Sequence, residues 1–137
     1  MEIITLDNDI KIFYVQATSY PDGIFDAHQK LHSIVPFSAD RKYFGLSRPE
    51  NDKYEIVYKA GAEEIEEGEA EKYNCEILII KSGKYVCTTV KDFRKDVLVI
   101  SNAFQELLTQ PDLDPEGYCL EWYSNTAEVV KCMIRLV

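Results

Sequence analysis

The sequence passes twice through the same order of predicted secondary-structure elements, and this repeat restricts the fold more than any other feature. Each copy is predicted to run strand, turn, strand, helix, strand, turn, strand. The first copy covers residues 1–60 and the second covers residues 75–137. An internal duplication of a ββαββ unit explains this order. Two such units predict an α+β fold in which about eight strands form one antiparallel sheet with two helices on one face.

Each copy contains one segment with the apolar spacing of an amphipathic helix. Over residues 24–35 apolar side chains recur every three or four positions, and Pro36 ends the pattern. A second helix is predicted over residues 93–110, where the same spacing ends near Pro111. The other apolar segments are short and mostly alternate with polar residues, as strands do.

The segment between the two copies, residues 61–74, is acidic. It contains Gly61, Gly68 and few apolar residues, a composition typical of a solvated connection. We therefore expect an exposed loop or linker there. A chain of 137 residues has the size of one domain, so residues 1–137 are expected to form a single domain with this linker between its halves.

The composition limits the classes of partner. The net charge is −9, which argues against direct nucleic-acid binding because that requires a basic surface. No apolar run is long enough to cross a membrane and no secretory signal begins the chain, so we expect a cytoplasmic protein. The sequence contains no nucleotide-binding motif and no cysteine pair with zinc-site spacing, and we predict no cofactor and no metal.

A carboxylate within a run of large apolar residues is the main candidate for function. The run Tyr118–Tyr123 lies between two turn-like segments, which predicts a strand. Alternation places Glu121 and Tyr123 on one face of this strand and Leu120 on the other. The next run, residues 129–137, alternates too, and we expect its apolar face to lie beside Leu120 in the core. Glu121 would then point to the helix-free face of the sheet, which would form a groove.

Two interpretations of Glu121 remain open. In the first, the carboxylate faces a bound cation, because charge pairing and cation–π contacts are strong away from bulk water. In the second, it makes a cross-strand ion pair with Lys131 or Arg135. His28 and His32 have the spacing of a metal pair on a helix, but no third ligand lies near them in the sequence. The predicted ligand-binding residues are Glu121, Tyr123, Tyr85, Phe44 and Tyr14.

Five segments, taken in order, carry a resemblance to a known family. They are Tyr43-Phe44-Gly45-Leu46-Ser47-Arg48-Pro49, Tyr54-Glu55-Ile56-Val57, Ser82-Gly83-Lys84-Tyr85, Ala103-Phe104-Gln105-Glu106-Leu107-Leu108 and Leu120-Glu121-Trp122-Tyr123. In this order they resemble the GyrI-like (gyrase-inhibitor-like) effector-binding domain. That domain also forms the sensor part of many bacterial AraC-type and MerR-type transcription regulators. The resemblance extends over nearly the whole chain.

The resemblance implies two pseudo-symmetric modules that build a curved antiparallel sheet with a groove for small molecules. Such molecules are often cationic and aromatic, as in multidrug binding. The resemblance assigns Glu121 to the bound cation and Tyr123 to the aromatic wall around it. It also includes stand-alone members, some of which associate with gyrase, while others are hydrolases that use a glutamate and a tyrosine of this groove.

We therefore predict a stand-alone module that binds a small cationic, aromatic or amphipathic molecule, and not an enzyme. The chain has no room for a helix-turn-helix domain, so nucleic acid is not an expected partner, and without a membrane-spanning apolar run a membrane is not expected either. One alternative is a hydrolase in which Glu121 is the general base and Tyr123 donates a proton. Another is a protein that interacts with gyrase.

Overall fold

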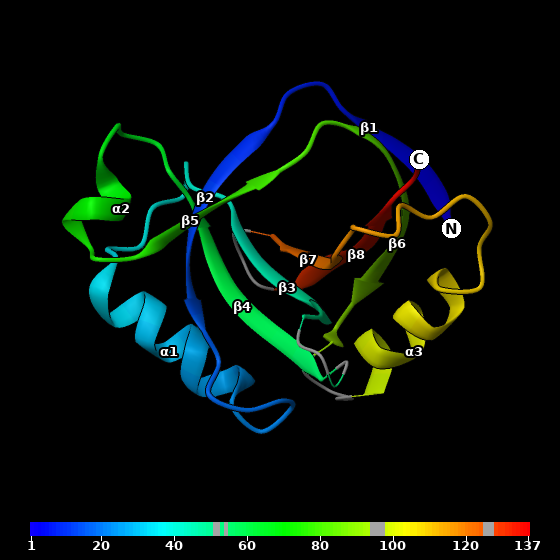
Figure 1. Cartoon of the computed structure of the whole chain (residues 1–137), viewed down its shortest axis with the longest axis horizontal. Helices are drawn as coiled ribbons and strands as arrows, with labels where there is room; N and C mark the ends of the chain where they lie inside the picture. The colour runs from blue at the N-terminus through cyan, green and yellow to red at the C-terminus, as the bar shows by residue number, and fades with distance from the viewer. Residues whose placement is uncertain (51–52, 54, 94–97, 125–127) are drawn as a thin grey trace.

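The computed structural model describes residues 1–50, 53, 55–93, 98–124 and 128–137. Within these residues, eight strands form a single sheet and three segments are helical (Figure 1). Part of the predicted helix 93–110 falls on residues 94–97, outside the described residues. None of the helices in the described ranges is long and apolar enough to cross a membrane. The elements are β1 (Glu2–Leu6), β2 (Ile10–Gln16), α1 (Ile24–Ile34), β3 (Tyr43–Pro49), β4 (Ile56–Glu63), α2 (Glu69–Lys72), β5 (Glu76–Ile80), β6 (Gly83–Lys91), α3 (Leu98–Leu107), β7 (Cys119–Tyr123) and β8 (Val129–Arg135).

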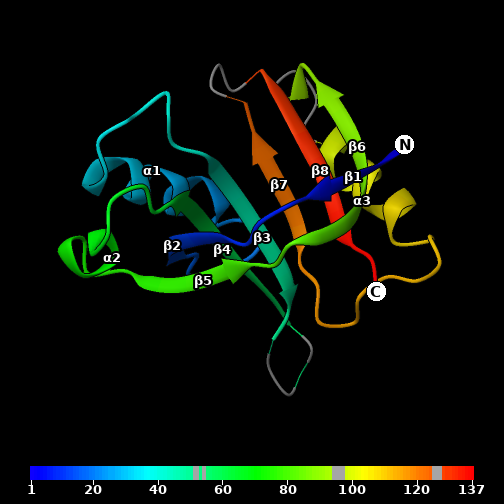
Figure 2. The same cartoon turned by 90° about the horizontal axis from the view of Figure 1, so that it is seen from above.

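The order of the strands in the sheet confirms the predicted duplication. The order is β1-β6-β8-β7-β3-β4-β2-β5, and every pairing between the described strands is antiparallel. Read from either end towards the centre, equivalent strands of the two copies occupy equivalent places. β3 and β7 are the central pair, and they join the two copies (Figure 2).

The first strand of each copy pairs with the other copy. β1 lies along β6, and β5 lies along β2. The turns at residues 7–9 and 81–82 therefore connect strands that are far apart in the sheet and do not close hairpins. Because each copy supplies an edge strand to the other, neither copy completes its half of the sheet alone.

The two long helices, α1 and α3, cover the same face of the sheet, as predicted. One row of directly paired residues runs across four strands, from Cys132 through Glu121 and Gly45 to Ala60. Directly paired residues point to the same face. Cys132 packs in the cluster under α3 and Ala60 packs in the cluster under α1. The middle of the row, Glu121 and Gly45, lies between the two helices.

The helix α1 ends one residue earlier than predicted. Val35 is extended, with φ −116° and ψ 119°. The residue before a proline is disfavoured in the helical conformation because the proline ring crowds it, and Pro36 follows. Ala27 and Leu31 form the buried stripe of the helix.

The helix-free face holds a separate apolar cluster, and Figure 1 shows this face on the inside of the curled sheet. The predicted face of Glu121 was wrong, because Leu120 and not Glu121 points to this inner face. Leu120 is paired with Met133, and Glu121 is paired with Cys132. Alternation within each strand was predicted correctly, but a register shift of one residue exchanges the faces. The inner cluster consists of Ile12, Phe44, Leu46, Ile80, Tyr85, Cys87, Leu120 and Met133.

The acidic segment 61–74 was expected as an exposed loop, and the structure differs. β4 continues to Glu63, and Gly61 is buried where an added Cβ would lie 2.7 Å from the Ile12 side chain. After it, the short helix α2 buries Glu69 to 5% exposure. The small residues Ala60, Gly61 and Ala62 allow β4 to pack closely within the sheet. The acidic composition of the segment gave no sign of this strand.

Glu69 is buried because it is fully paired. Its two carboxylate oxygens accept hydrogen bonds from the guanidinium of Arg41 at 3.0 and 2.9 Å. One of them also accepts the backbone N–H groups of Ile65 and Glu66. Chiefly because of the Arg41 hydrogen bonds, the pKa of Glu69 falls to about 2.

We expect Glu69→Gln to lower the free energy of unfolding by about 3 kcal/mol at pH 7, since it leaves the buried Arg41 charge uncompensated. Urea denaturation measures the loss. The folded pKa lies below that of an unfolded glutamate, so this stabilisation is present above about pH 4.5 and is lost as the pH falls towards 2. Glu71→Gln, an exposed change on the same helix, is the control. Equal effects of the two changes at pH 7 would contradict the assignment.

Candidate functional site

Glu121 lies in the central strand β7 and is only 7% exposed. It points to the face that carries α1 and α3, at the middle of the row that joins their two cores. Burial raises the pKa of this carboxyl, while hydrogen bonds from Tyr123 and Tyr58 act in the opposite direction. The carboxylate is therefore removed from water without a charge to offset its own.

The hydrogen bonds of Glu121 leave one of its oxygens unused. The Tyr58 hydroxyl donates to Oε1 at 3.1 Å, and the Tyr123 hydroxyl donates to the same atom. Among the described residues no hydrogen bond ends on Oε2, and none of their ion pairs includes Glu121. When it is ionised, this carboxylate is therefore held by two neutral hydroxyls, with no counter-ion in the described part of the chain.

His28 extends the hydrogen-bond chain to α1. Its Nε2 lies 2.7 Å from the Tyr58 hydroxyl. Because that hydroxyl donates to Glu121, the imidazole must be the donor, which requires a proton on Nε2. The ring also contacts Tyr58 and Tyr123 edge-on, with centroids 5.7 and 5.6 Å apart. Burial lowers the pKa of His28 to about 4, so the histidine is neutral at pH 7 and does not serve as the counter-ion.

Gly45 makes the space in which these groups meet. It is paired directly with Glu121 on the neighbouring strand β3. A Cβ at this position would lie 2.1 Å from the Tyr58 hydroxyl oxygen and 2.9 Å from Oε1 of Glu121. Any larger residue would separate the tyrosine from the carboxylate.

Two further aromatic rings pack against the tyrosines that bind Glu121. The Tyr20 ring, just before α1, stacks on Tyr58 with centroids 6.4 Å apart and remains 47% exposed. Phe93, after β6, contacts Tyr123 at 5.7 Å. We call the set Glu121, Tyr58, Tyr123, His28, Tyr20 and Phe93 the carboxylate site.

Only two of the five predicted ligand-binding residues meet in this site. Glu121 and Tyr123 are hydrogen-bonded. Tyr85 and Phe44 belong to the inner cluster, and Tyr14, which donates to Glu76 at 2.8 Å, shares the face of Phe44 through their common pairing with Gly61. These three residues lie on the opposite face of the sheet from Glu121.

Sequence reasoning missed the other members of the site. Tyr58 was not singled out, because its position beside Glu121 depends on the order of β4, β3 and β7 in the sheet. His28 was weighed as a metal ligand and assigned instead to helix packing, so its hydrogen bond to Tyr58 was not foreseen. No group of three potential metal ligands occurs among the described residues. The signal that could have found Gly45 is a glycine inside a strand, which often marks a close approach of other groups.

The cross-strand ion pair that was the alternative for Glu121 does not form. Lys131 is paired with Trp122, so it lies on the other face, 6.0 Å from the centre of the indole ring. Arg135 binds Asp114 at 3.1 Å.

The comparisons with known proteins show the fold. A scan against models of protein families and a search of curated proteins both find no match. Among solved structures, an integron cassette protein from the mobile metagenome of Vibrio cholerae matches with a TM-score of 0.74 and 17% identity, over 99% of this chain and 95% of that one. SAV2435 bound to tetraphenylphosphonium matches with a TM-score of 0.70 and 11% identity, over 99% and 93%. The EcmrR C-terminal domain matches with a TM-score of 0.63 and 10% identity, over 99% and 97%.

The fold is that of GyrI-like effector-binding domains. The resemblance seen in the sequence is thereby confirmed at the level of the GyrI-like fold. At 10–17% identity the likeness carries no residue roles, so the carboxylate site stands on its own geometry.

We expect Glu121→Gln to stabilise the GyrI-like fold at pH 7. The raised pKa means that the folded protein holds the carboxyl proton more tightly than the unfolded chain does. Glu121 therefore favours folding below about pH 4.5 and opposes it as the pH rises. Urea denaturation should show equal midpoints for the variant and the wild type at pH 4 and a higher midpoint for the variant at pH 7.

His28 is present in both proteins, so its own destabilisation below pH 6.5 cancels in this comparison. Glu76→Gln is the matched control, because it removes an exposed carboxylate that also accepts a tyrosine hydrogen bond. A wild type more stable than Glu121→Gln at pH 7 would show that the carboxylate is already compensated.

Proposed function

We propose that this chain binds a small organic cation with aromatic or other apolar groups, and that Glu121 is its counter-ion. The observation that carries the proposal is the buried carboxylate of Glu121, whose hydrogen bonds within the described part of the chain come from two tyrosine hydroxyls. A buried charge is retained at a cost in stability unless a partner compensates it. Here a ligand is the partner, and Oε2 is the atom free to receive it.

The surrounding rings suit a cation that also has apolar surface. A cation close to the faces of aromatic rings is attracted by their electron density, and the rings exclude water from the charge pair. Tyr58, Tyr123 and Tyr20 supply three such rings around one carboxylate. A small hydrated metal ion makes no apolar contact with these rings, whereas an aromatic or alkylated cation packs against them.

A protein of the same fold, SAV2435, has been determined with tetraphenylphosphonium bound. This cation has four aromatic rings and no hydrogen-bond donor, which matches the chemistry of the carboxylate site. The likeness supports the class of ligand and leaves open which cation is natural for this chain.

The ligand enters by displacing aromatic side chains. Glu121 lines neither the cavity beside Leu120 and Lys81 nor the pocket beside Pro49 and Pro115. Tyr20 is the most exposed ring of the site and lies in the segment that precedes α1. We propose that Tyr20 moves off Tyr58, that the ligand enters between the two rings beside Oε2, and that the Tyr20 ring then covers the bound ligand.

Isothermal titration with tetraphenylphosphonium tests the charge. We expect Glu121→Gln to weaken binding by about five- to 150-fold, the range for loss of a charge-assisted contact of about 1–3 kcal/mol. Binding of triphenylphosphine oxide, a neutral relative of similar shape, should change little. Glu76→Gln is the control on the opposite face. Equal losses for the two ligands, or none, would refute the role of Glu121.

A second pair of variants tests which face of the sheet binds. We expect Tyr20→Ala to weaken tetraphenylphosphonium binding about three- to tenfold, because one ring contact of about 0.5–1.5 kcal/mol is lost. Tyr14→Ala removes a tyrosine from the inner face and should leave the affinity unchanged. If only Tyr14→Ala weakens binding, the cation occupies the face that the sequence first indicated.

A further inference from the structure

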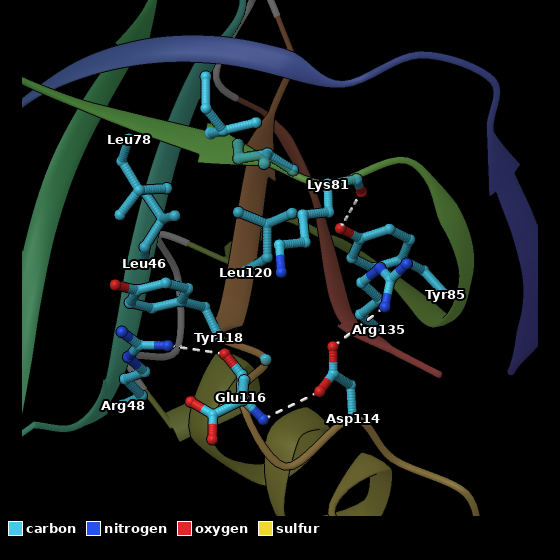
Figure 3. Close-up of a pocket in the computed structure, with 13 residues that line it drawn as sticks. Leu46, Arg48, Leu78, Lys81, Tyr85, Asp114, Glu116, Tyr118, Leu120 and Arg135 are labelled. Carbon is cyan, nitrogen blue, oxygen red and sulfur yellow. Dashed lines mark hydrogen bonds and ion pairs between the residues drawn. The ribbon is translucent and has the colours of Figure 1, made fainter. Parts of the chain in front are cut away.

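A cavity of about 360 Å³ lies on the inner, helix-free face of the sheet (Figure 3). Its volume is within the range of about 300–1,000 Å³ that is usual for small-molecule sites. We call it the inner cavity. Its apolar floor comes from four strands and consists of Leu46, Leu78, Ile80, Tyr85 and Leu120.

The inner cavity and the carboxylate site lie back to back on the same strands. On β7, Leu120 lines the cavity and its neighbour Glu121 points to the helix face. On β3, Leu46 lines the cavity and its neighbour Gly45 faces the carboxylate site. Because successive residues of a strand point to opposite faces, a ligand in the cavity contacts no residue of the carboxylate site.

Three cationic side chains line the inner cavity, and two of them, Arg48 and Arg135, already have acidic partners within the protein. Arg48 contacts Glu50 at 3.2 Å and covers the Tyr118 ring at 4.0 Å. Arg135 binds Asp114 at 3.1 Å and donates to the backbone oxygen of residue 82 at 3.0 Å. Both guanidinium groups thus have partners that fix their positions at the rim.

Lys81 is the third cation, and it has no such partner. It forms no ion pair or side-chain hydrogen bond with the residues that the structure describes. Figure 3 shows its side chain directed into the cavity, beside Leu120. Its backbone oxygen accepts the Tyr85 hydroxyl at 2.6 Å, which fixes the segment from which the side chain projects.

Lys81 interacts electrostatically with Asp9 and Asp114, but both carboxylates have hydrogen-bonded partners of their own. Asp114 is bound to Arg135, and Asp9 accepts the backbone N–H of Ser82 at 2.7 Å. Glu116, the other acid on the cavity wall, is exposed at the rim. The lining therefore has more positive than negative groups in a chain whose net charge is −9.

We propose that the inner cavity is a second ligand site, which binds an amphipathic carboxylate. Its hydrocarbon part lies on the apolar floor, and its carboxylate pairs with the ammonium of Lys81. The general negative charge of the chain repels anions at a distance, so binding depends on this local cation. The site is independent of the cation proposed at Glu121.

Decanoate is the probe, and isothermal titration at pH 7 measures its binding to the whole chain. We expect Lys81→Met, which keeps most of the stem and removes the charge, to weaken decanoate at least about tenfold. Lys84→Met is the matched control, because Lys84 is an exposed lysine of the adjoining strand β6 that does not line the cavity. It should leave the affinity within about twofold.

Decan-1-ol, which has the same tail and no charge, should bind the wild type at least about tenfold more weakly than decanoate does. Leu78→Trp fills the cavity from the edge strand β5 and should abolish binding of both ligands, while Glu121→Gln should leave decanoate binding unchanged. No decanoate binding to the wild type, equal effects of Lys81→Met and Lys84→Met, equal affinities for the two ligands, or retained binding in Leu78→Trp would each overturn the proposal.

Discussion

The pairing of β3 with β7 is the constraint on which the site depends. It joins the two copies of the repeat and sets Gly45 directly opposite Glu121. Tyr58, one strand further, reaches the carboxylate only because the glycine has no side chain in its path. A shift of this register by one residue would turn Glu121 to the inner face and replace it with an apolar neighbour. The seam of the duplication and the centre of the candidate site are therefore the same place.

Two glutamates of nearly equal burial show what distinguishes a structural carboxylate from one that is open to a ligand. Glu69 is 5% exposed and Glu121 is 7% exposed. Glu69 has a guanidinium and two backbone N–H groups, and its pKa falls to about 2. Glu121 has two neutral hydroxyls, and burial raises its pKa. Glu69 thus stabilises the fold where Glu121 opposes it, and a protein retains such an opposing charge most readily where a partner binds.

The sequence was sufficient for the order of the eight strands and of the helices α1 and α3, for the fold class and for placing Glu121 beside Tyr123, because these follow from local periodicity and turns; it did not show the short helix α2. The exchange of β1 and β5 between the copies and the face of Glu121 were not predictable, since both are set by long-range pairing. The relative phase of β7 and β8 depends on the connection between them, and only the observed register shows that Glu121 lies beside Cys132. Tyr85, Phe44 and Tyr14 were selected as aromatic residues near strands, without the sheet order that separates them from the site.

The position of β7 also restricts how a ligand can reach Glu121. β7 is paired along both sides, with β3 and with β8, so moving its backbone would break two ladders of hydrogen bonds at once. Moving a side chain on the helix face breaks no hydrogen bonds of the sheet. Tyr20 lies outside the sheet, and its stacking on Tyr58 is its only ring contact among the described residues. Entry of a cation through displacement of Tyr20 leaves the sheet unchanged, and the inner cavity on the other side of β7 keeps its shape while the carboxylate site is filled.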